Sequence, residues 1–152
     1  MAELRAEMEA DLAATKACME AKGWPIIVHP DFGYSPAGPL TDEQDRLFGQ
    51  AGAACSDELS DHHVETEGEW RVKYRHALDT RDCLVAQGYH PTEPPSEDAW
   101  VDDGMSGSGD LWNPFEDIIW QFLHGQIKLD EKTYYELYAT CPQGGSTASL
   151  GW

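Results

Sequence analysis

Hydrophobic residues recur at intervals of three and four along the start of the chain, which is the period of one face of an α-helix. The stripe consists of Leu4, Met8, Leu12, Thr15, Cys18 and Met19. Gly23 and Trp24 follow directly, and a glycine followed by a hydrophobic residue is typical of a Schellman helix end. We therefore expect a helix over residues 2–22 that stops at a glycine with positive φ.

The next segments carry strand, turn and capping signals. Residues 24–29 are apolar and β-branched, and a turn signal over 31–33 precedes Tyr34, which predicts a short hairpin. Thr41 and Gln44 have the spacing of a capping box, so we expect a second helix that reaches Leu59.

The second half of the chain predicts four more helical segments. We expect helices over 69–87, from Ser96 to Trp100, from Asn113 to Gly125, and from Asp130 to Thr140. Between the second and third of these, residues 102–110 are rich in glycine and serine and are expected to form a mobile loop. The predicted fold is mainly α, or α+β with a minor hairpin.

One phrase occurs twice in the chain. Residues 15–24 recur as residues 80–89 with a threonine, a cysteine, a glycine and an aromatic residue in the same places, and each copy is followed by one further cysteine. This predicts two related helical modules over residues 1–60 and 69–143, joined by an acidic linker over 61–68 and followed by a flexible tail over 144–152.

The chain has four cysteines and no C-x-x-C pair. Long spacings suit a disulfide framework in an oxidising compartment, whereas four buried free thiols would suit a reducing one. Of the three pairings that four cysteines allow, the repeat favours Cys18–Cys55 and Cys83–Cys141.

The composition is strongly acidic, with a net charge of −18 and a pI near 4.4. This disfavours nucleic acid and anionic membrane surfaces as partners. It fits a solvated acidic shell or a cationic partner steered by the field of the protein. No apolar run approaches a membrane span, and residues 1–20 lack the apolar core of a signal peptide, so an exported protein would be represented here by its mature part.

Few residues have the spacing of a known chemical site. His62 and His63 lie among carboxylates but are adjacent on a linker, and residues 102–113 lack two of the oxygen donors of a calcium loop. No nucleophile, zinc-protease, phosphate-loop or dinucleotide motif is present. We expect no metal site, no cofactor and no catalytic residue.

The second module is rich in aromatic residues, most of which a small core would absorb. We expect Trp100, Trp112 and Tyr134 to contribute to a partly exposed binding surface, because the expected loop over 102–110 lies between the two tryptophans and binding residues gather on loops. The full set is Trp100, Trp112, Phe115, Trp120, Phe122, Tyr134, Tyr135 and Tyr138.

Several of these motifs together resemble a group of uncharacterised secreted proteins and lipoproteins of actinobacteria. The resemblance covers roughly residues 15–143 and rests on Cys18 to Trp24, Cys55, Thr80 to Tyr89, Pro94-Pro95-Ser96, Trp112 to Phe115, Leu137 and Cys141-Pro142. It implies an extracytoplasmic, envelope-associated location and a non-catalytic role.

The sequence therefore favours a non-catalytic secreted or cell-envelope binding or accessory protein, with an unknown protein, peptide or glycan as ligand. Two alternatives remain at this point. One is a small hydrolase that uses paired carboxylates, and the other is a structural spacer domain.

Overall fold

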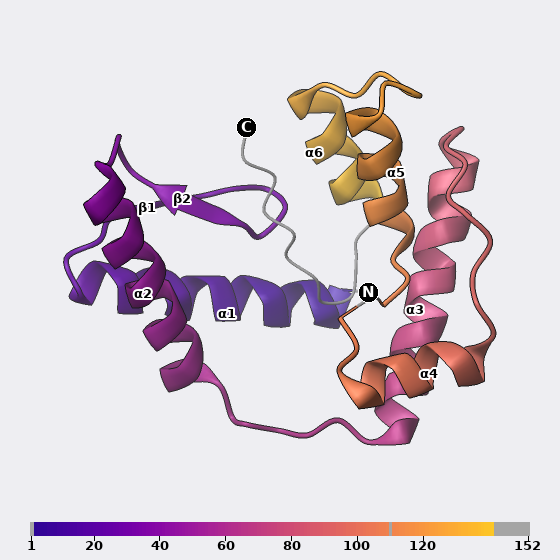
Figure 1. The fold of residues 1–152 in the computed structure, drawn as a ribbon, viewed down its shortest axis with the longest axis horizontal. Coiled ribbons are helices and arrows are strands. Elements are labelled where there is room, and N and C mark those ends of the chain that lie inside the picture. The colour runs from indigo at the N-terminus through magenta and orange to yellow at the C-terminus, as the bar shows by residue number, and fades with distance from the viewer. Residues whose placement is uncertain (1, 110, 142–152) are drawn as a thin grey trace. The chain divides into compact units, whose positions relative to one another are not determined.

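A computed structural model describes residues 2–109 and 111–141 and confirms a mainly α-helical fold with one small hairpin (Figure 1). The described chain divides into two compact units between His63 and Val64, and each is described by itself. Among the described residues, none of the helices combines the length and hydropathy that a membrane span requires.

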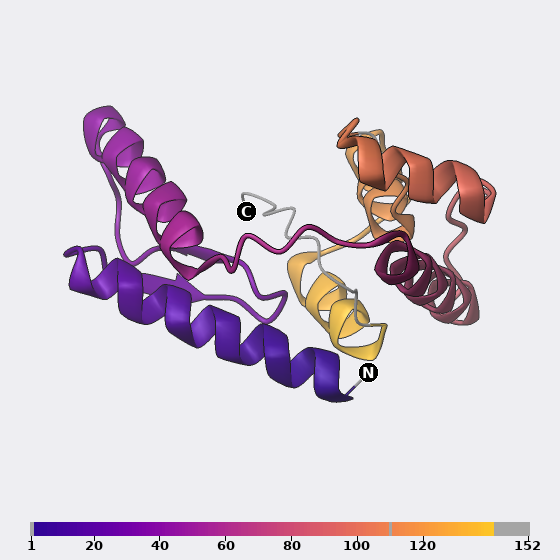
Figure 2. The same cartoon turned by 90° about the horizontal axis from the view of Figure 1, so that it is seen from below.

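The described residues of the N-terminal unit form two helices with a hairpin between them. The hairpin strands are antiparallel, with Val28 opposite Tyr34, and they lie alongside the first helix in both ribbon views (Figures 1 and 2). At the hairpin turn, the Arg5 guanidinium lies 5.8 Å from the centroid of the Phe32 ring. The elements are α1 (Ala2–Ala21), β1 (Ile26–Val28), β2 (Tyr34–Pro36) and α2 (Asp42–Leu59).

The core of this unit is small and contains the disulfide. Met19, Ile26 and Cys55 are buried, and the disulfide from Cys18 to Cys55 joins the end of α1 to α2. The rings of Trp24 and Tyr34 meet the ring of Phe48 edge-on at centroid distances of 5.8 and 6.0 Å. Covalent and apolar contacts therefore converge where α2 crosses the last turns of α1 (Figure 1).

The described residues of the C-terminal unit form four helices, and both α4 and α5 pack against α3. The disulfide from Cys83 to Cys141 joins the last turn of α3 to the residue that follows α6. Both predicted disulfide pairings are thus confirmed. The helices are α3 (Glu67–Ala86), α4 (Glu97–Ser106), α5 (Pro114–Leu123) and α6 (Glu131–Thr140).

The two copies of the repeated phrase end α1 and α3 with the same hydrogen bonds. Gly23 and Gly88 have φ values of 87° and 91°, as predicted. The N–H of Trp24 donates to the Met19 carbonyl over 2.9 Å, and the N–H of Tyr89 donates to the Leu84 carbonyl over 3.0 Å. These are the six-to-one bonds of Schellman motifs. Met19 and Leu84, which accept them, are both fully buried.

The hairpin, the Thr41 capping box and the starts of α5 and α6 agree with the sequence prediction, but one helix start differs. α3 begins at Glu67, two residues early, because Thr66 and Glu69 form a second capping box. The expected tail over 144–152 lies outside the described residues.

The mobile loop expected over 102–110 is wrong for residues 102–106. These residues continue α4, which ends at Gly107 in the left-handed conformation with a φ of 65°. Gly104 suggested a loop, yet it lies in the helix. Its missing side chain makes room there for the indole of Trp70. The glycine is there for close packing rather than for flexibility.

Gly104→Ala tests this packing. A Cβ at position 104 would lie 2.6 Å from Cε3 of Trp70, so we expect the substitution to lower the free energy of unfolding by about 1–3 kcal/mol in urea titrations. Gly49→Ala in α2 is the matched control, because a Cβ there meets nothing within 4 Å. It should stabilise the protein by up to about 1 kcal/mol through helix propensity. Stabilisation by both substitutions would contradict the role assigned to Gly104.

Candidate binding surface

The sequence predicts that Trp100, Trp112 and Tyr134 bind a ligand, but the structure places only Trp100 and Trp112 together and puts Tyr134 in a different aromatic group. Trp100 is 4% exposed, and its ring packs against Trp70 and Tyr74 at centroid distances of 5.7 and 5.6 Å. Tyr134 is 2% exposed and packs in a different aromatic group, with Phe115 at 6.2 Å. These two side chains are core residues, because burial leaves their rings almost no accessible surface.

Trp112 is half-buried and packs against the cluster that contains Trp100, and of the three predicted residues it alone is not fully buried. Its carbonyl accepts a 2.8 Å hydrogen bond from Nε1 of Trp100, so the structure brings these two tryptophans together. Its own Nε1 donates to Oγ1 of Thr92 over 3.1 Å, and Asp117 of α5 accepts from the backbone N–H of Thr92 over 2.9 Å. Trp112 thus helps to hold the extended segment before α4 against α5, and its role in binding stays a prediction.

A different aromatic side chain is far more accessible. Trp120 is 52% exposed and Leu123 is 68% exposed, although both lie in the most hydrophobic helix of the chain. With Glu116 and His124 they occupy positions i, i+4, i+7 and i+8, which share one side of a helix. We call these four residues the α5 surface.

The sequence around α5 explains why these side chains are left outside. Asn113 caps the helix, Pro114 takes its first position, and Gly125 ends it with a φ of 69°. Apolar residues surround this short helix on more than one side, and only one side can face the core. The core takes Phe115, Ile118 and Ile119, so Trp120 and Leu123 remain exposed.

His124 orders the exposed indole. Its imidazole stacks on the Trp120 ring with centroids 3.8 Å apart and planes 22° apart. Nδ1 of His124 lies 2.8 Å from the Trp120 carbonyl, which fits a ring that donates through Nδ1. One side of the indole is therefore covered by the imidazole, while half of the residue's surface remains exposed.

Glu116 places a carboxylate one turn before Trp120. It forms no ion pair or hydrogen bond with any residue that the structure describes. Although much of Glu116 is exposed, partial burial raises the pKa of its carboxyl group, and the neighbouring charge of Asp117 raises it further. An ionised Glu116 is consequently a carboxylate without a counter-charge.

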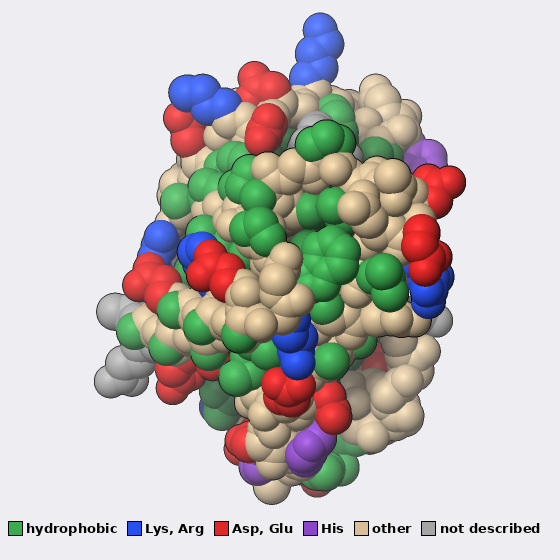
Figure 3. All heavy atoms as spheres, turned by 90° about the vertical axis from the view of Figure 1, so that its left-hand side faces the viewer, with side chains coloured by type: hydrophobic (Ala, Val, Ile, Leu, Met, Phe, Trp, Pro, Cys, Tyr) green, Lys and Arg blue, Asp and Glu red, His purple; other side chains and the backbone are tan. Residues whose placement is uncertain are grey.

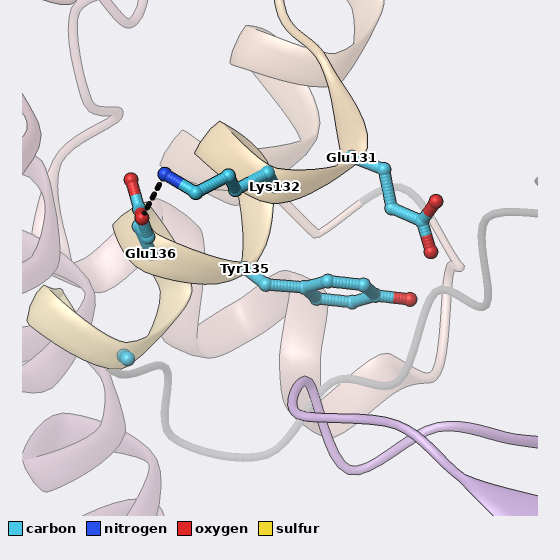
Figure 4. A pocket seen from close by; sticks show the side chains of 5 residues that line it. Glu131, Lys132, Tyr135 and Glu136 are labelled. Carbon is cyan, nitrogen blue, oxygen red and sulfur yellow. Dashed lines mark ion pairs between the residues drawn. The ribbon is translucent and has the colours of Figure 1, made fainter.

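A second surface feature is an open hollow along α6 (Figure 4). The ring of Tyr135 extends along it on the side of Glu131, and Nζ of Lys132 pairs with Glu136 over 2.6 Å. The hollow is open and is lined by one helix, so no groups converge on a ligand from opposite sides. Its lining residues are Glu131, Lys132, Tyr135, Glu136 and Ala139.

The described residues offer little for catalysis or metal binding. They contain no group of three or more His, Cys, Asp and Glu side chains placed to hold a metal ion. Asp31 is the one buried carboxylate within the described ranges, and it accepts a 3.1 Å hydrogen bond from the Gly33 N–H in the hairpin turn. The paired buried carboxylates that a hydrolase would use are not found in this part of the chain.

Comparisons with models of protein families, with curated proteins and with solved structures find no match to this chain. The choice of the α5 surface as the candidate binding site therefore depends on its geometry alone. Sequence reasoning noted Trp120 only as one of many aromatic residues. One signal in the sequence could have distinguished Trp120 from the buried aromatic residues. The segment that forms α5 has more apolar residues than one side of a helix can bury.

The raised pKa of Glu116 gives a pH-dependent prediction. A raised pKa means that the folded protein binds the proton of Glu116 more tightly than the unfolded chain does. The stability that this preference provides is lost as the pH rises through the folded pKa. We expect Glu116→Gln to increase the free energy of unfolding at pH 7, and we expect the gain to vanish below the usual glutamate pKa of 4.5. Urea titrations at several pH values measure both effects.

Glu43→Gln provides a control of opposite sign. A hydrogen bond from Arg46 lowers the pKa of Glu43, so its contribution is present above the usual pKa and is lost as the pH falls through the folded pKa. Glu43→Gln should reduce stability at pH 7. If the effect of Glu116→Gln did not depend on pH, or if this substitution lowered stability at pH 7, the raised pKa of Glu116 would be contradicted.

Proposed function

We propose that the protein is a non-catalytic secreted or cell-envelope binding or accessory protein that contacts its ligand through the α5 surface. The observation that carries this proposal is the exposure of Trp120 and Leu123 beside each other on a disulfide-stapled unit. Exposed apolar patches with polar neighbours mark interaction sites in soluble proteins.

The disulfides support the compartment. Both are formed within the described chain, and disulfides persist in oxidising compartments outside the cytosol. Secretion is the further step that we propose, and the resemblance to secreted actinobacterial proteins supports it.

The chemistry of the α5 surface favours recognition over catalysis. Tryptophan is enriched among the residues that dominate binding energy at interfaces. The stacked His124 ring limits the freedom of the indole, so less conformational entropy is lost when a ligand covers it. A protein or peptide ligand suits the combination of Trp120 with Leu123, because a leucine side chain adds purely apolar area.

Small neutral probes test this proposal on the full chain. Phenol and N-acetylglucosamine are titrated into ¹⁵N-labelled protein, and amide shifts are followed by NMR. We expect shifts to concentrate on residues 120–124 and on the Trp120 indole N–H, and we expect Trp120→Leu to remove them. Leu59→Ala, at another exposed leucine, is the control and should leave them unchanged.

Two outcomes would overturn the proposal. Shifts that cluster on α6 around Tyr135 would place the binding surface elsewhere in the unit. An absence of localised shifts with either probe would favour the structural spacer.

A further inference from the structure

We infer that the α5 surface binds an arginine- or lysine-containing segment of a partner protein. The inference rests on the proposed function and adds the chemistry of the partner. It depends on three observations, namely the exposure of the Trp120 indole, the carboxylate of Glu116 and the charge of the whole chain.

The indole of Trp120 is prepared for a flat cation. His124 stacks on one side of the ring at a centroid distance of 3.8 Å, and the residue is still 52% exposed, so about half of its surface stays accessible to a ligand. A guanidinium or ammonium group over a tryptophan ring is attracted by the negative charge density of the ring. An arginine side chain would also cover Leu123 with its methylene groups.

Glu116 lies four residues before Trp120 in α5 and can supply the counter-charge. Side chains four residues apart on a helix are neighbours, so a cation bound on the indole of Trp120 would lie near the carboxylate of Glu116. This carboxylate forms no ion pair with a described residue, and partial burial disfavours its charged form. A bound cation would reverse that penalty, because an opposite charge favours the ionised carboxylate.

The C-terminal unit already contains the same combination of groups in its own structure. Nζ of Lys73 lies 4.8 Å from the centroid of the Trp70 ring and forms an ion pair with Glu65. Cation, indole and carboxylate thus meet within one chain at that site. The α5 surface presents the indole and the carboxylate, and a partner would supply the cation.

The charge of the chain favours a cationic segment over a second copy of this protein as the ligand of the α5 surface. With 28 acidic and 10 basic residues, the protein attracts cationic segments and repels a second copy of itself. Figure 3 shows one face of the molecule, where acidic side chains are more numerous than basic ones and hydrophobic side chains lie between them. Repulsion between two copies would act across any close contact, because screening becomes effective only beyond about 8 Å at physiological salt.

The hollow on α6 carries a weaker argument for the same ligand. Its residue Glu136 is already paired with Lys132, and this hydrogen bond raises the pKa of Lys132. An incoming cation would have to compete with that lysine. The α5 surface has no such competitor within the described residues, so it is the better site.

The test compares two peptides that differ only in charge. A fluorescein-labelled peptide of alternating arginine and glycine is titrated with the full chain by fluorescence anisotropy, beside the same peptide with citrulline in place of arginine. Citrulline keeps the shape of arginine and removes its charge. We expect the arginine peptide to bind at least about fivefold more tightly, the range that a cation–π contact and an ion pair provide.

Variants of the protein locate the binding. Glu116→Gln and Trp120→Leu should each weaken binding of the arginine peptide by about threefold or more. Glu7→Gln makes the same change of charge on an exposed part of α1 and is the matched control, which should leave the affinity almost unchanged. Circular dichroism verifies the fold of each variant, and both α5 positions are exposed, so folding should be retained.

The outcomes separate this inference from the proposed function. Equal weakening by Glu7→Gln and Glu116→Gln would show diffuse attraction to an acidic protein, and equal affinity for the citrulline peptide would exclude recognition of the cation. Either result overturns the inference while neutral-probe shifts at Trp120 persist. Loss of those shifts as well would overturn the proposed function.

Discussion

Each unit depends on a disulfide that fixes the last turn of a long helix just before the helix stops at a glycine. In the N-terminal unit, Cys55 is itself one of three residues in the buried cluster. A core of this size cannot offset the conformational entropy of folding by apolar burial alone. Closing a loop of 37 or 58 residues removes entropy worth about 4 kcal/mol from the unfolded chain. The disulfides therefore supply stability that the cores lack.

Acidic side chains lie at helix starts, where they add stability to a protein with small cores. The first turns of α2 to α6 contain acidic residues, where the positive end of the helix dipole stabilises them. Much of the negative charge is thus compatible with the helices, and it remains available to attract a cationic partner. The C-terminal unit uses Phe115, Tyr134 and Trp100 for its core, and among the described tryptophan, tyrosine and phenylalanine residues of this unit Trp120 is left exposed. A binding site on this unit would therefore consist of aromatic and apolar side chains that the core leaves exposed.

Local signals in the sequence predicted much of the fold, whereas packing decided the site. The glycine stops at Gly23 and Gly88, the Thr41 capping box and both disulfide pairings could be predicted, because each depends on a few neighbouring residues or on the repeat. The extension of α4 past Trp100 could not, because it depends on Trp70 packing against Gly104 from another helix. For the same reason, sequence alone did not distinguish the buried rings of Trp100 and Tyr134 from the exposed ring of Trp120.

Native-state hydrogen exchange after removal of a single disulfide tests the central claim, that each unit is stabilised by its own cross-link. In a Cys18→Ala/Cys55→Ala variant, amides of α1 and α2 should exchange faster by a factor corresponding to about 4 kcal/mol. Amides of α3 to α6 should keep the protection that they have in the parent protein. A uniform loss of protection across both units would contradict the account, as would unchanged exchange in α1 and α2.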